Sequence, residues 1–328
     1  MRISAGLPIG VAALLFESAE ARRDLEGRLA AHLLDSGFRE AILPVVDYLD
    51  PYEEMLDSVG RKELYRLVDR DGEVLVLRSD FTPMLARLIA PRLASLELPL
   101  KLFYRGDVLR YQQDHTGYRR EFYQVGAELL GMPGEEGAWL ALRHFLELLS
   151  IEQSPDLVVV LGFAGALDRL ILDCANGQDP SAVAEAVIRR ERGAVRAGGD
   201  ALLQVVKHGL PDDPGVLGEE EAKRLERLQL LCREAAELFP AIELRIDLAE
   251  FADQTLAPEL AHGADTRAYY DGLVFKAFAG RTAQPVGGGG RYDRLFHELG
   301  APVTAVGFGV ILDRLAGRAT GTPEESRA

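Results

Sequence analysis

An Asp-Gly turn between two apolar runs is the feature that most constrains how this chain can fold. Residues 65–67 and 73–77 are largely apolar, and Arg70, Asp71 and Gly72 lie between them. Asp-Gly at such a position is typical of a β-hairpin. Strands that are joined by a hairpin, and not by a helical crossover, pair antiparallel.

Two longer runs repeat this pattern. Residues 100–104 and 122–130 have strand character, and the polar stretch 111–120 connects them. Strand character returns at residues 242–246 and 305–308. Strands joined by hairpins and flanked by helical segments favour an α+β fold with an antiparallel sheet.

Helical patterns occur near the N-terminus and through the middle of the chain. Apolar residues recur at helical spacing over residues 17–34, which predicts a long amphipathic helix. The stretch 164–240 is rich in Ala, Leu, Arg and Glu and is interrupted by Gly and Pro clusters, as an inserted helical subdomain would be. We therefore expect a core domain over residues 1–163 and 241–318, a helical insertion over 164–240 and a polar tail over 319–328.

The charge balance and the cysteine count argue against several kinds of function. The 52 acidic residues outnumber the 37 basic ones, so the net charge of −15 gives no general attraction for a phosphate backbone. Cys174 and Cys232 lie far apart without a histidine at metal-ligand spacing, and we expect neither a disulfide nor a metal site. No apolar run approaches the roughly 20 residues that span a bilayer. We expect a cytoplasmic protein without a cofactor.

Two carboxylates stand out because of their surroundings. Asp80 and Glu128 lie beside or within apolar segments, where an ionised group needs a partner. A bound ammonium or imidazolium group is one such partner, and a structural arginine such as Arg78 or Arg110 is another. The four glycines at 287–290 permit close approach to a ligand or a neighbouring strand, although the spacing of a phosphate-binding loop is absent.

A tyrosine pair falls in the strand-like run 268–278. Adjacent side chains on a strand point to opposite faces, so we expect one ring of Tyr269 and Tyr270 in the core and the other facing solvent or a pocket. Taken alone, the pair is typical of aromatic packing.

Several segments, taken in order, resemble the motifs of class II aminoacyl-tRNA synthetases, and specifically those of the histidyl-tRNA synthetase family. The clearest is the second motif, because residues 120–128 (REFYQVGAE) are similar to the family's Arg-Gln-Phe-His-Gln-Leu-Gly-Cys-Glu. The other matches are the first motif at residues 37–44, Leu-Arg-Pro-Glu-Gly-Thr at 77–82, Asp-Tyr-Tyr at 269–270, Gly-Gly-Arg-Tyr-Asp at 289–293 and the third motif at 306–315. Together they cover almost the whole chain.

The resemblance implies a pocket for histidine. The residues that it implies are Asp80, Thr82 and Gln124 for the ammonium group, and Glu128 with one or both of Tyr269 and Tyr270 for the imidazole ring. Carboxylates bind ammonium through charge-assisted hydrogen bonds, and an acceptor beside a tyrosine hydroxyl suits a ring with two nitrogens. Arg110 and Arg314 match motif arginines that contact ATP, which makes them candidates for a residual nucleotide or anion site.

Departures from the synthetase pattern weaken the case for amino-acid activation. In the synthetases an arginine four residues before the tyrosine pair assists activation, whereas this chain has Asp265 there and Arg267 two residues later. A carboxylate at that position would repel the substrate carboxylate and the phosphates of ATP. The glutamate expected two positions after Arg110 is Gln112. The chain also stops 13 residues after Leu315, so we expect no anticodon-binding domain.

The chain retains the residues of the amino-acid pocket and has replaced those that assist activation. In this combination it resembles the synthetase-like family that regulates ATP phosphoribosyltransferase in histidine biosynthesis. Its members partner a short-form catalytic subunit, and the complex is inhibited by histidine. The resemblance implies a non-catalytic regulatory subunit with L-histidine as effector, a homodimeric core within a hetero-oligomer, and no tRNA partner. Two alternatives stay open: a truncated enzyme that adenylates histidine for tRNA or a carrier protein, and an assembly scaffold with a vestigial pocket.

Overall fold

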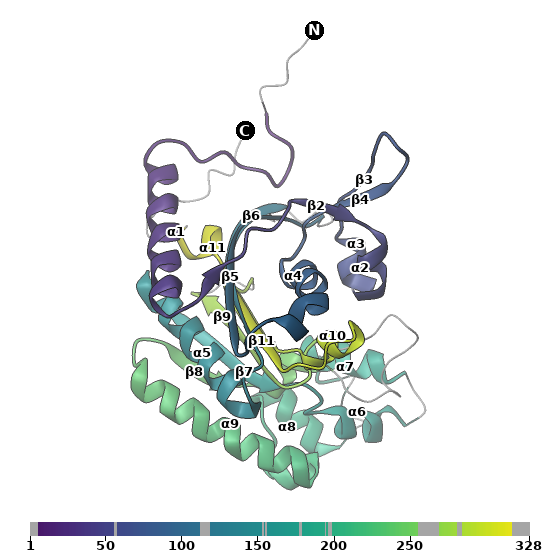
Figure 1. Cartoon of the computed structure of the whole chain (residues 1–328). Coiled ribbons are helices and arrows are strands. Elements are labelled where there is room, and N and C mark those ends of the chain that lie inside the picture. The colour runs from purple at the N-terminus through teal and green to yellow at the C-terminus, as the bar shows by residue number, and fades with distance from the viewer. Residues whose placement is uncertain are drawn as a thin grey trace.

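A mixed sheet forms the centre of the molecule. The computed structural model describes residues 6–55, 58–111, 119–152, 154, 156–176, 179–193, 195, 199–254, 269–280 and 284–316, and within them one eight-stranded and one three-stranded sheet occur (Figure 1). In spatial order the large sheet contains β1 (Arg39–Glu40), β5 (Leu100–Leu109), β6 (Glu121–Leu130), β11 (Ala305–Ile311), β10 (Gly287–Arg291), β9 (Leu273–Ala279), β7 (Leu157–Phe163) and β8 (Glu243–Ile246). The small sheet contains β2 (Val46–Tyr48), β4 (Val74–Leu77) and β3 (Arg66–Val68).

The structure confirms both predicted hairpins and corrects the sheet at its edges. Strands β3 and β4 pair antiparallel around the Asp-Gly turn, and so do the long strands β5 and β6. However, β1 pairs with β5 in parallel and β7 pairs with β8 in parallel. The predicted antiparallel sheet is therefore confirmed for the inner strands, and only these two outermost pairings are parallel. Parallel strands need a long crossover connection, and both pairs have one.

The crossover between β7 and β8 is the helical stretch that the sequence predicts as an insertion. It carries α6 (Asp168–Ala175), α7 (Pro180–Ile188), α8 (Asp200–His208), the 3₁₀ turn η3 (Pro214–Leu217) and α9 (Glu219–Leu238). Buried residues of these helices, such as Val187 and Leu202, belong to the same hydrophobic cluster as the strands. The division into a core domain and an insertion stays a prediction, as does the polar tail, which lies outside the described residues.

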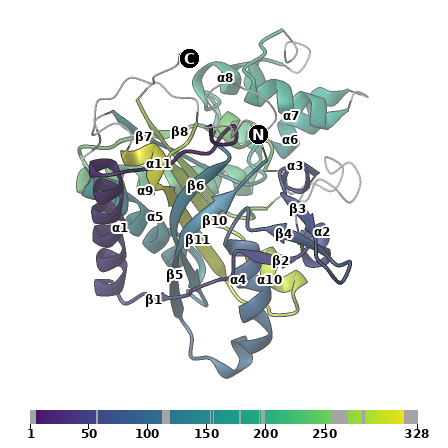
Figure 2. The same ribbon diagram turned by 90° about the horizontal axis from the view of Figure 1, so that it is seen from above.

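Helices cover both faces of the large sheet (Figure 2). Helices α1 (Glu17–Asp35) and α5 (Gly134–Ile151) lie on one face, and α4 (Thr82–Ile89) and α10 (Asp293–Glu298) lie on the other. The remaining elements are α2 (Asp50–Met55), α3 (Ser58–Lys62), α11 (Leu312–Ala316), η1 (Ala90–Ser95) and η4 (Leu248–Phe251). None of the helices in the described parts of the chain combines the length and the apolar character that a membrane span requires.

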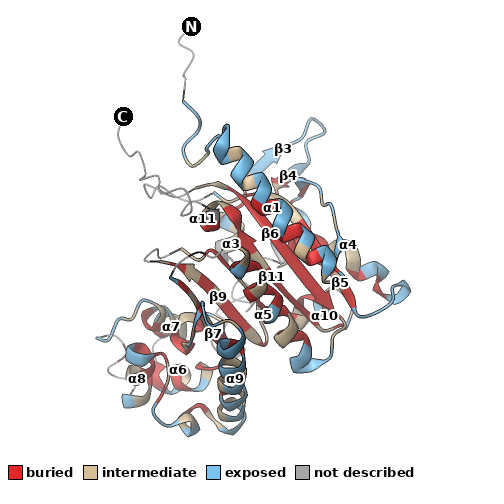
Figure 3. Ribbon diagram, turned by 90° about the vertical axis from the view of Figure 1, so that its left-hand side faces the viewer, coloured by how far each residue is buried: buried red, intermediate tan, exposed pale blue. Residues whose placement is uncertain are grey.

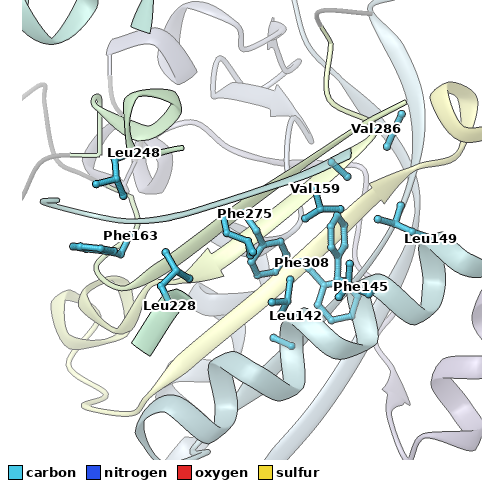
Figure 4. Close-up of a cluster of buried hydrophobic side chains, with 14 of the residues drawn as sticks. Leu142, Phe145, Leu149, Val159, Phe163, Leu228, Leu248, Phe275, Val286 and Phe308 are labelled. Carbon is cyan, nitrogen blue, oxygen red and sulfur yellow. The ribbon is translucent and has the colours of Figure 1, made fainter. Parts of the chain in front are cut away.

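The largest hydrophobic cluster lies between the sheet and α5. Phe145 of α5 packs against Phe275 of β9 and Phe308 of β11, with ring centroids 4.9 and 5.9 Å apart (Figure 4). All three rings are almost completely buried. The central strands are accordingly buried along most of their length, whereas α1 and α9 expose their outer sides (Figure 3). A second cluster, which includes Phe81 and Phe296, fills the space beneath α4 and α10.

Strand β10 has room for glycine only. A Cβ atom at Gly289 would lie 2.2 Å from the carbonyl oxygen of Gly307 on the neighbouring strand. We expect Gly289→Ala to lower the free energy of unfolding by about 1–3 kcal/mol, because the backbone of β11 would have to move. Gly27→Ala is the matched control, since Gly27 is exposed in α1 with nothing within 4 Å of its Cβ position. That change should stabilise the chain by about 0.5–1 kcal/mol. Urea unfolding of both variants checks the prediction, which fails if Gly289→Ala is as stable as the wild-type chain.

Candidate functional site

A pocket of about 290 Å³ lies on the face of the sheet that α4 and α10 cover. Its lining residues with polar side chains are Asp80, Thr82, Tyr104, Arg110, Gln124, Tyr269, Tyr270, Lys276, Tyr292 and Arg314. Five of the six residues predicted to bind histidine are among them, as are both arginines predicted to form an anion site. The sixth, Glu128 of β6, is buried beside Gly307 of the neighbouring strand β11. The structure therefore brings all of these residues together, while their role in binding histidine stays a prediction.

Glycines on the pocket side of two strands create this space. A Cβ at Gly307 of β11 would lie 1.5 Å from Oε2 of Glu128, and a Cβ at Gly309 would lie 2.6 Å from Nε2 of Gln124. On β10, a Cβ at Gly290 would lie 2.7 Å from the ring of Tyr270. Any other residue at these positions would displace the side chains that form the pocket. The predicted close approach at the glycine run is thus confirmed.

Strand alternation explains why Gln124 and Glu128 share one face of β6. Residues two apart on a strand point the same way, so the positions between them face the opposite side. Val125 and Ala127 indeed belong to the large hydrophobic cluster on that side. The alternation therefore places the amide of Gln124 and the carboxylate of Glu128 on the same side of the sheet, at the pocket.

Three hydroxyl groups surround the carboxylate of Glu128, which is 1% exposed. Thr82 Oγ1 donates to Oε1 at 2.7 Å, and the hydroxyl of Tyr104 donates to the same oxygen at 3.0 Å. The hydroxyl of Tyr292 donates to Oε2. Within the described chain no arginine or lysine forms an ion pair with Glu128, so these hydroxyls are its only polar partners there.

Burial raises the pKa of Glu128 from 4.5 to about 7. Loss of hydration is the largest cause, since a buried carboxylate is less stable when charged. Hydrogen bonds from Tyr292, Thr82 and Tyr104 act in the opposite direction because they favour the ionised form. The group is therefore close to half ionised at neutral pH, and a cation or N–H donor in the pocket would favour ionisation.

Arg110 is the arginine that pairs with Asp80, whereas the sequence had left Arg78 and Arg110 as alternatives. Arg110 Nη2 donates to Asp80 Oδ2 at 3.3 Å, and Arg110 Nε donates to the carbonyl oxygen of Ser79 at 2.8 Å. The other carboxylate oxygen of Asp80 accepts the backbone N–H of Thr82 at 3.1 Å, at the start of α4. Arg78 instead donates to backbone carbonyl groups, among them that of Asp107.

The two predicted anion-site arginines meet at one aromatic ring. The guanidinium carbons of Arg110 and Arg314 each lie 5.4 Å from the centroid of Phe122. Arg314 Nη1 also donates to the carbonyl oxygen of Pro285 at 2.7 Å. Two guanidinium groups at the same end of a pocket can bind a carboxylate or a phosphate.

The expectation for the tyrosine pair was wrong. Strand β9 begins at Leu273, so Tyr269 and Tyr270 precede it and do not alternate between its faces. Their rings lie 4.8 Å apart and nearly perpendicular, and Tyr269 also stacks on Tyr292 at 5.6 Å. Both tyrosines of the pair therefore line the pocket.

Two tyrosines that donate to Glu128 were not among the predicted site residues. Tyr104 opens the segment before Arg110, and Tyr292 is the tyrosine of Gly-Gly-Arg-Tyr-Asp. The match at residues 289–293 includes Tyr292, but the family resemblance assigned neither tyrosine to the histidine pocket. Asp265, Arg267 and Gln112, which carry the predicted departures from the synthetase pattern, lie outside the described residues.

A group of three side chains between α1 and α5 has the composition of a metal site. His32, His144 and Glu147 each place one ligand atom within 4.8 Å of the others. Nε2 of His32 and Nδ1 of His144 lie 3.0 and 2.8 Å from Oε2 of Glu147, so hydrogen bonds alone account for the arrangement. Burial lowers the pKa of His144, which keeps its ring neutral. None of the three lines the pocket, and the expectation of no metal stays a prediction.

Comparison with known proteins agrees with the motifs. The family described as histidyl-tRNA synthetase matches residues 10–315. The ATP phosphoribosyltransferase regulatory subunit of Symbiobacterium thermophilum is 34% identical over 94% of this chain and 78% of that protein. The protein of the same description from Moorella thermoacetica is 31% identical over 94% of this chain and 80% of that protein.

Solved structures show the same fold. A Bacillus halodurans chain described as an ATP phosphoribosyltransferase regulatory subunit/histidyl-tRNA synthetase has a TM-score of 0.77 at 23% identity, covering 97% of this chain and 84% of that chain. A chain of the ATP phosphoribosyl transferase (HisG:HisZ) complex from Thermotoga maritima has a TM-score of 0.64 at 18% identity, covering 89% of this chain and 97% of that chain. The fold, the ordered motifs and the sequence identity place this chain in the histidyl-tRNA synthetase-like family, among the ATP phosphoribosyltransferase regulatory subunits.

Proposed function

We propose that the chain acts as the regulatory subunit of an ATP phosphoribosyltransferase, the enzyme of the first step of histidine biosynthesis. In this role it binds and activates a short-form catalytic subunit and mediates feedback inhibition by L-histidine. The observation that carries the proposal is the 34% identity, over 94% of the chain, to a curated regulatory subunit. A homodimeric core, the helical insertion at residues 164–240 and a location in the cytoplasm belong to the same proposal.

The pocket supports histidine as the effector. Asp80 offers a carboxylate to an ammonium group, and the paired arginines Arg110 and Arg314 offer donors to a carboxylate. Glu128 and the hydroxyl of Tyr270 offer polar partners to the two nitrogens of an imidazole ring. Free histidine needs all three kinds of partner at once, because it carries an ammonium group, a carboxylate and an imidazole ring.

The contacts of Glu128 supply a route from ligand to protein. Its hydroxyl partners come from α4, from β5 and from the residue before α10. An imidazole N–H that bonds to Glu128 competes with these hydroxyls, so ligand binding acts on several elements together. Histidine regulates the complex only if it binds two conformational states with unequal affinity, and this network is where such a difference would arise.

A non-catalytic role fits the sequence at the activation position. Asp265 stands where the synthetases have an arginine, and a carboxylate there opposes stabilisation of negative charge on ATP.

One observation favours the second candidate, a histidine-adenylating enzyme. Arg110 and Arg314 remain in the pocket, where they are able to bind phosphate groups.

We expect Glu128→Gln to weaken histidine binding at least tenfold, because the buried carboxylate would no longer accept a charge-assisted hydrogen bond, which contributes about 1.5–3 kcal/mol. Tyr270→Phe should weaken binding less, since it removes one hydroxyl. Calorimetric titration with L-histidine, with and without the catalytic subunit, checks both variants. Glu185→Gln, at an exposed position of α7, is the control. Unchanged affinity in Glu128→Gln would move the histidine site elsewhere.

The two candidate functions differ in a single assay. We expect no histidine-dependent exchange of pyrophosphate into ATP, because Asp265 replaces the activating arginine. An active histidyl-tRNA synthetase serves as the positive control under the same conditions. Exchange above background that Arg314→Met abolishes would establish the adenylating enzyme and exclude a purely regulatory role.

The raised pKa of Glu128 predicts how pH affects stability. The folded chain holds this proton more tightly than the unfolded chain, with a pKa of about 7 against 4.5. The resulting stabilisation is complete below pH 4.5 and is lost as the pH rises through 7. Relative to Glu128→Gln, whose amide does not titrate, the wild-type chain should lose about 3 kcal/mol of unfolding free energy across this range. Urea unfolding at a series of pH values tests this, and a constant difference between the two chains would contradict it.

A further inference from the structure

A second cavity of about 470 Å³ lies between α9, the first turns of α5 and the start of β9. Its apolar walls are Trp139, Phe163, Leu228, Leu231 and Leu273. Phe163 and Leu228 lie at one end of the buried hydrophobic cluster (Figure 4). The cavity has no lining residue in common with the first pocket. Its volume falls within the range of small-molecule sites, about 300–1,000 Å³.

A guanidinium group at this cavity lacks an acceptor. Arg224 of α9 is partly buried, and its guanidinium lies 4.5 Å from the ring centroid of Phe163. It makes no hydrogen bond or ion pair with the described part of the chain, although the group carries five N–H donors. Burial accordingly lowers the pKa of Arg224. The other two arginines that line the cavity are already paired, Arg227 with Glu135 at 2.8 Å and Arg291 with Asp293 at 2.5 Å.

A carboxylate oxygen at the same cavity lacks a donor. Asp271 Oδ2 accepts the backbone N–H of Arg294 at 2.6 Å. Oδ1 of Asp271 is buried and has no hydrogen-bond partner among the described residues. Among the charged neighbours of Arg224, Glu221 acts on it more strongly than Arg291 and Asp271 do. Neither Glu221 nor Asp271 forms an ion pair with Arg224 in the described chain. Two residues that line the cavity therefore lack hydrogen-bond partners within the described part of the chain: Arg224 at its guanidinium group and Asp271 at its buried Oδ1.

The charges around the cavity select the class of ligand. A pure anion would satisfy Arg224 but would meet Asp271 and the acidic residues Glu135, Glu136 and Glu234. A pure cation would leave Arg224 without an acceptor. A zwitterion satisfies both groups, and the aromatic and leucine walls suit an apolar substituent.

We propose that this cavity binds a free amino acid with an apolar side chain, with its carboxylate at Arg224, its ammonium group at Asp271 and its side chain against Trp139 and Leu231. The binding itself does not depend on the proposed regulatory function. Any effect of this ligand on the catalytic subunit does rest on that function.

The two pockets are built from the same short segments. Asp271 directly follows Tyr269 and Tyr270 of the first pocket, and Arg291, which lines the second cavity, directly precedes Tyr292, which bonds to Glu128. A ligand that repositions Asp271 or Arg291 therefore acts on neighbours in the first pocket. This makes the cavity a site for a second effector.

Trp139 provides a direct reporter because it is the only tryptophan in the chain. We expect saturable changes in its fluorescence, and a matching calorimetric signal, on titration with L-leucine or L-phenylalanine. Isocaproate and isoamylamine, which each lack one charged group of leucine, should bind at least tenfold more weakly. If neither amino acid gives a signal in either measurement, or if isocaproate binds as well as leucine, the proposal is wrong.

Substitutions at the cavity test whether leucine binds there. Arg224→Met, which keeps an apolar stem over Phe163, and Asp271→Asn, which can still accept from Arg294, should each raise the dissociation constant for leucine at least tenfold. Arg189→Met changes the exposed arginine that directly follows α7 and should have no effect. Thermal unfolding confirms that the variants are folded.

Glu128→Gln separates this proposal from the proposed function. In that variant leucine binding should persist while histidine binding is weakened at least tenfold. Loss of leucine binding in Glu128→Gln, but not in Arg224→Met, would place leucine in the first pocket and overturn the proposal. A change in Trp139 fluorescence caused by the catalytic subunit alone, and by neither amino acid, would identify the cavity as a protein contact instead.

Discussion

The enclosed carboxylate of Glu128 is the constraint on which the surrounding structure depends. No cation in the described chain forms an ion pair with it, so hydroxyl groups from α4, β5 and the residue before α10 must satisfy its oxygens. Gly307 has to lack a side chain, because a Cβ would overlap Glu128 Oε2. A partly satisfied buried network is costly in a medium of low dielectric constant. One residue thus sets the relative positions of two helices and two strands.

Strand alternation then distributes function to both sides of the same segments. Gly290 and Tyr292 border the first pocket, while Arg291 between them lines the second cavity. Tyr270 and Asp271, which precede β9, likewise line different sites. Because adjacent residues serve different sites, a shift of either segment cannot affect one site alone. This geometry gives the chain a physical means of coupling ligands without a long pathway.

Local patterns in the sequence sufficed wherever the structure depends on local contacts. The Asp-Gly turn predicted the β3–β4 hairpin, and the resemblance to the family motifs pointed to Asp80, Thr82, Gln124 and Glu128, which the structure brings together. The parallel edge pairings were missed because each joins strands separated by a long crossover. Tyr269 and Tyr270 were misplaced because their run reads as strand, although β9 begins only at Leu273. The second cavity depends on α9 packing near α5, which no spacing reveals.

Charge balance distinguishes the ligands that the first pocket can hold. Among the described residues, Arg110, Arg314 and Lys276 bring positive charge to it, and Arg110 is already bonded to Asp80 while Lys276 is bonded to Glu250. With Glu128 ionised, the three carboxylates of Asp80, Glu128 and Glu250 equal these three cations in number. A polyanion such as a nucleoside triphosphate would have to break these pairs, whereas a zwitterion only exchanges partners within them. The electrostatics of the pocket therefore favour recognition of an amino acid over its activation by ATP.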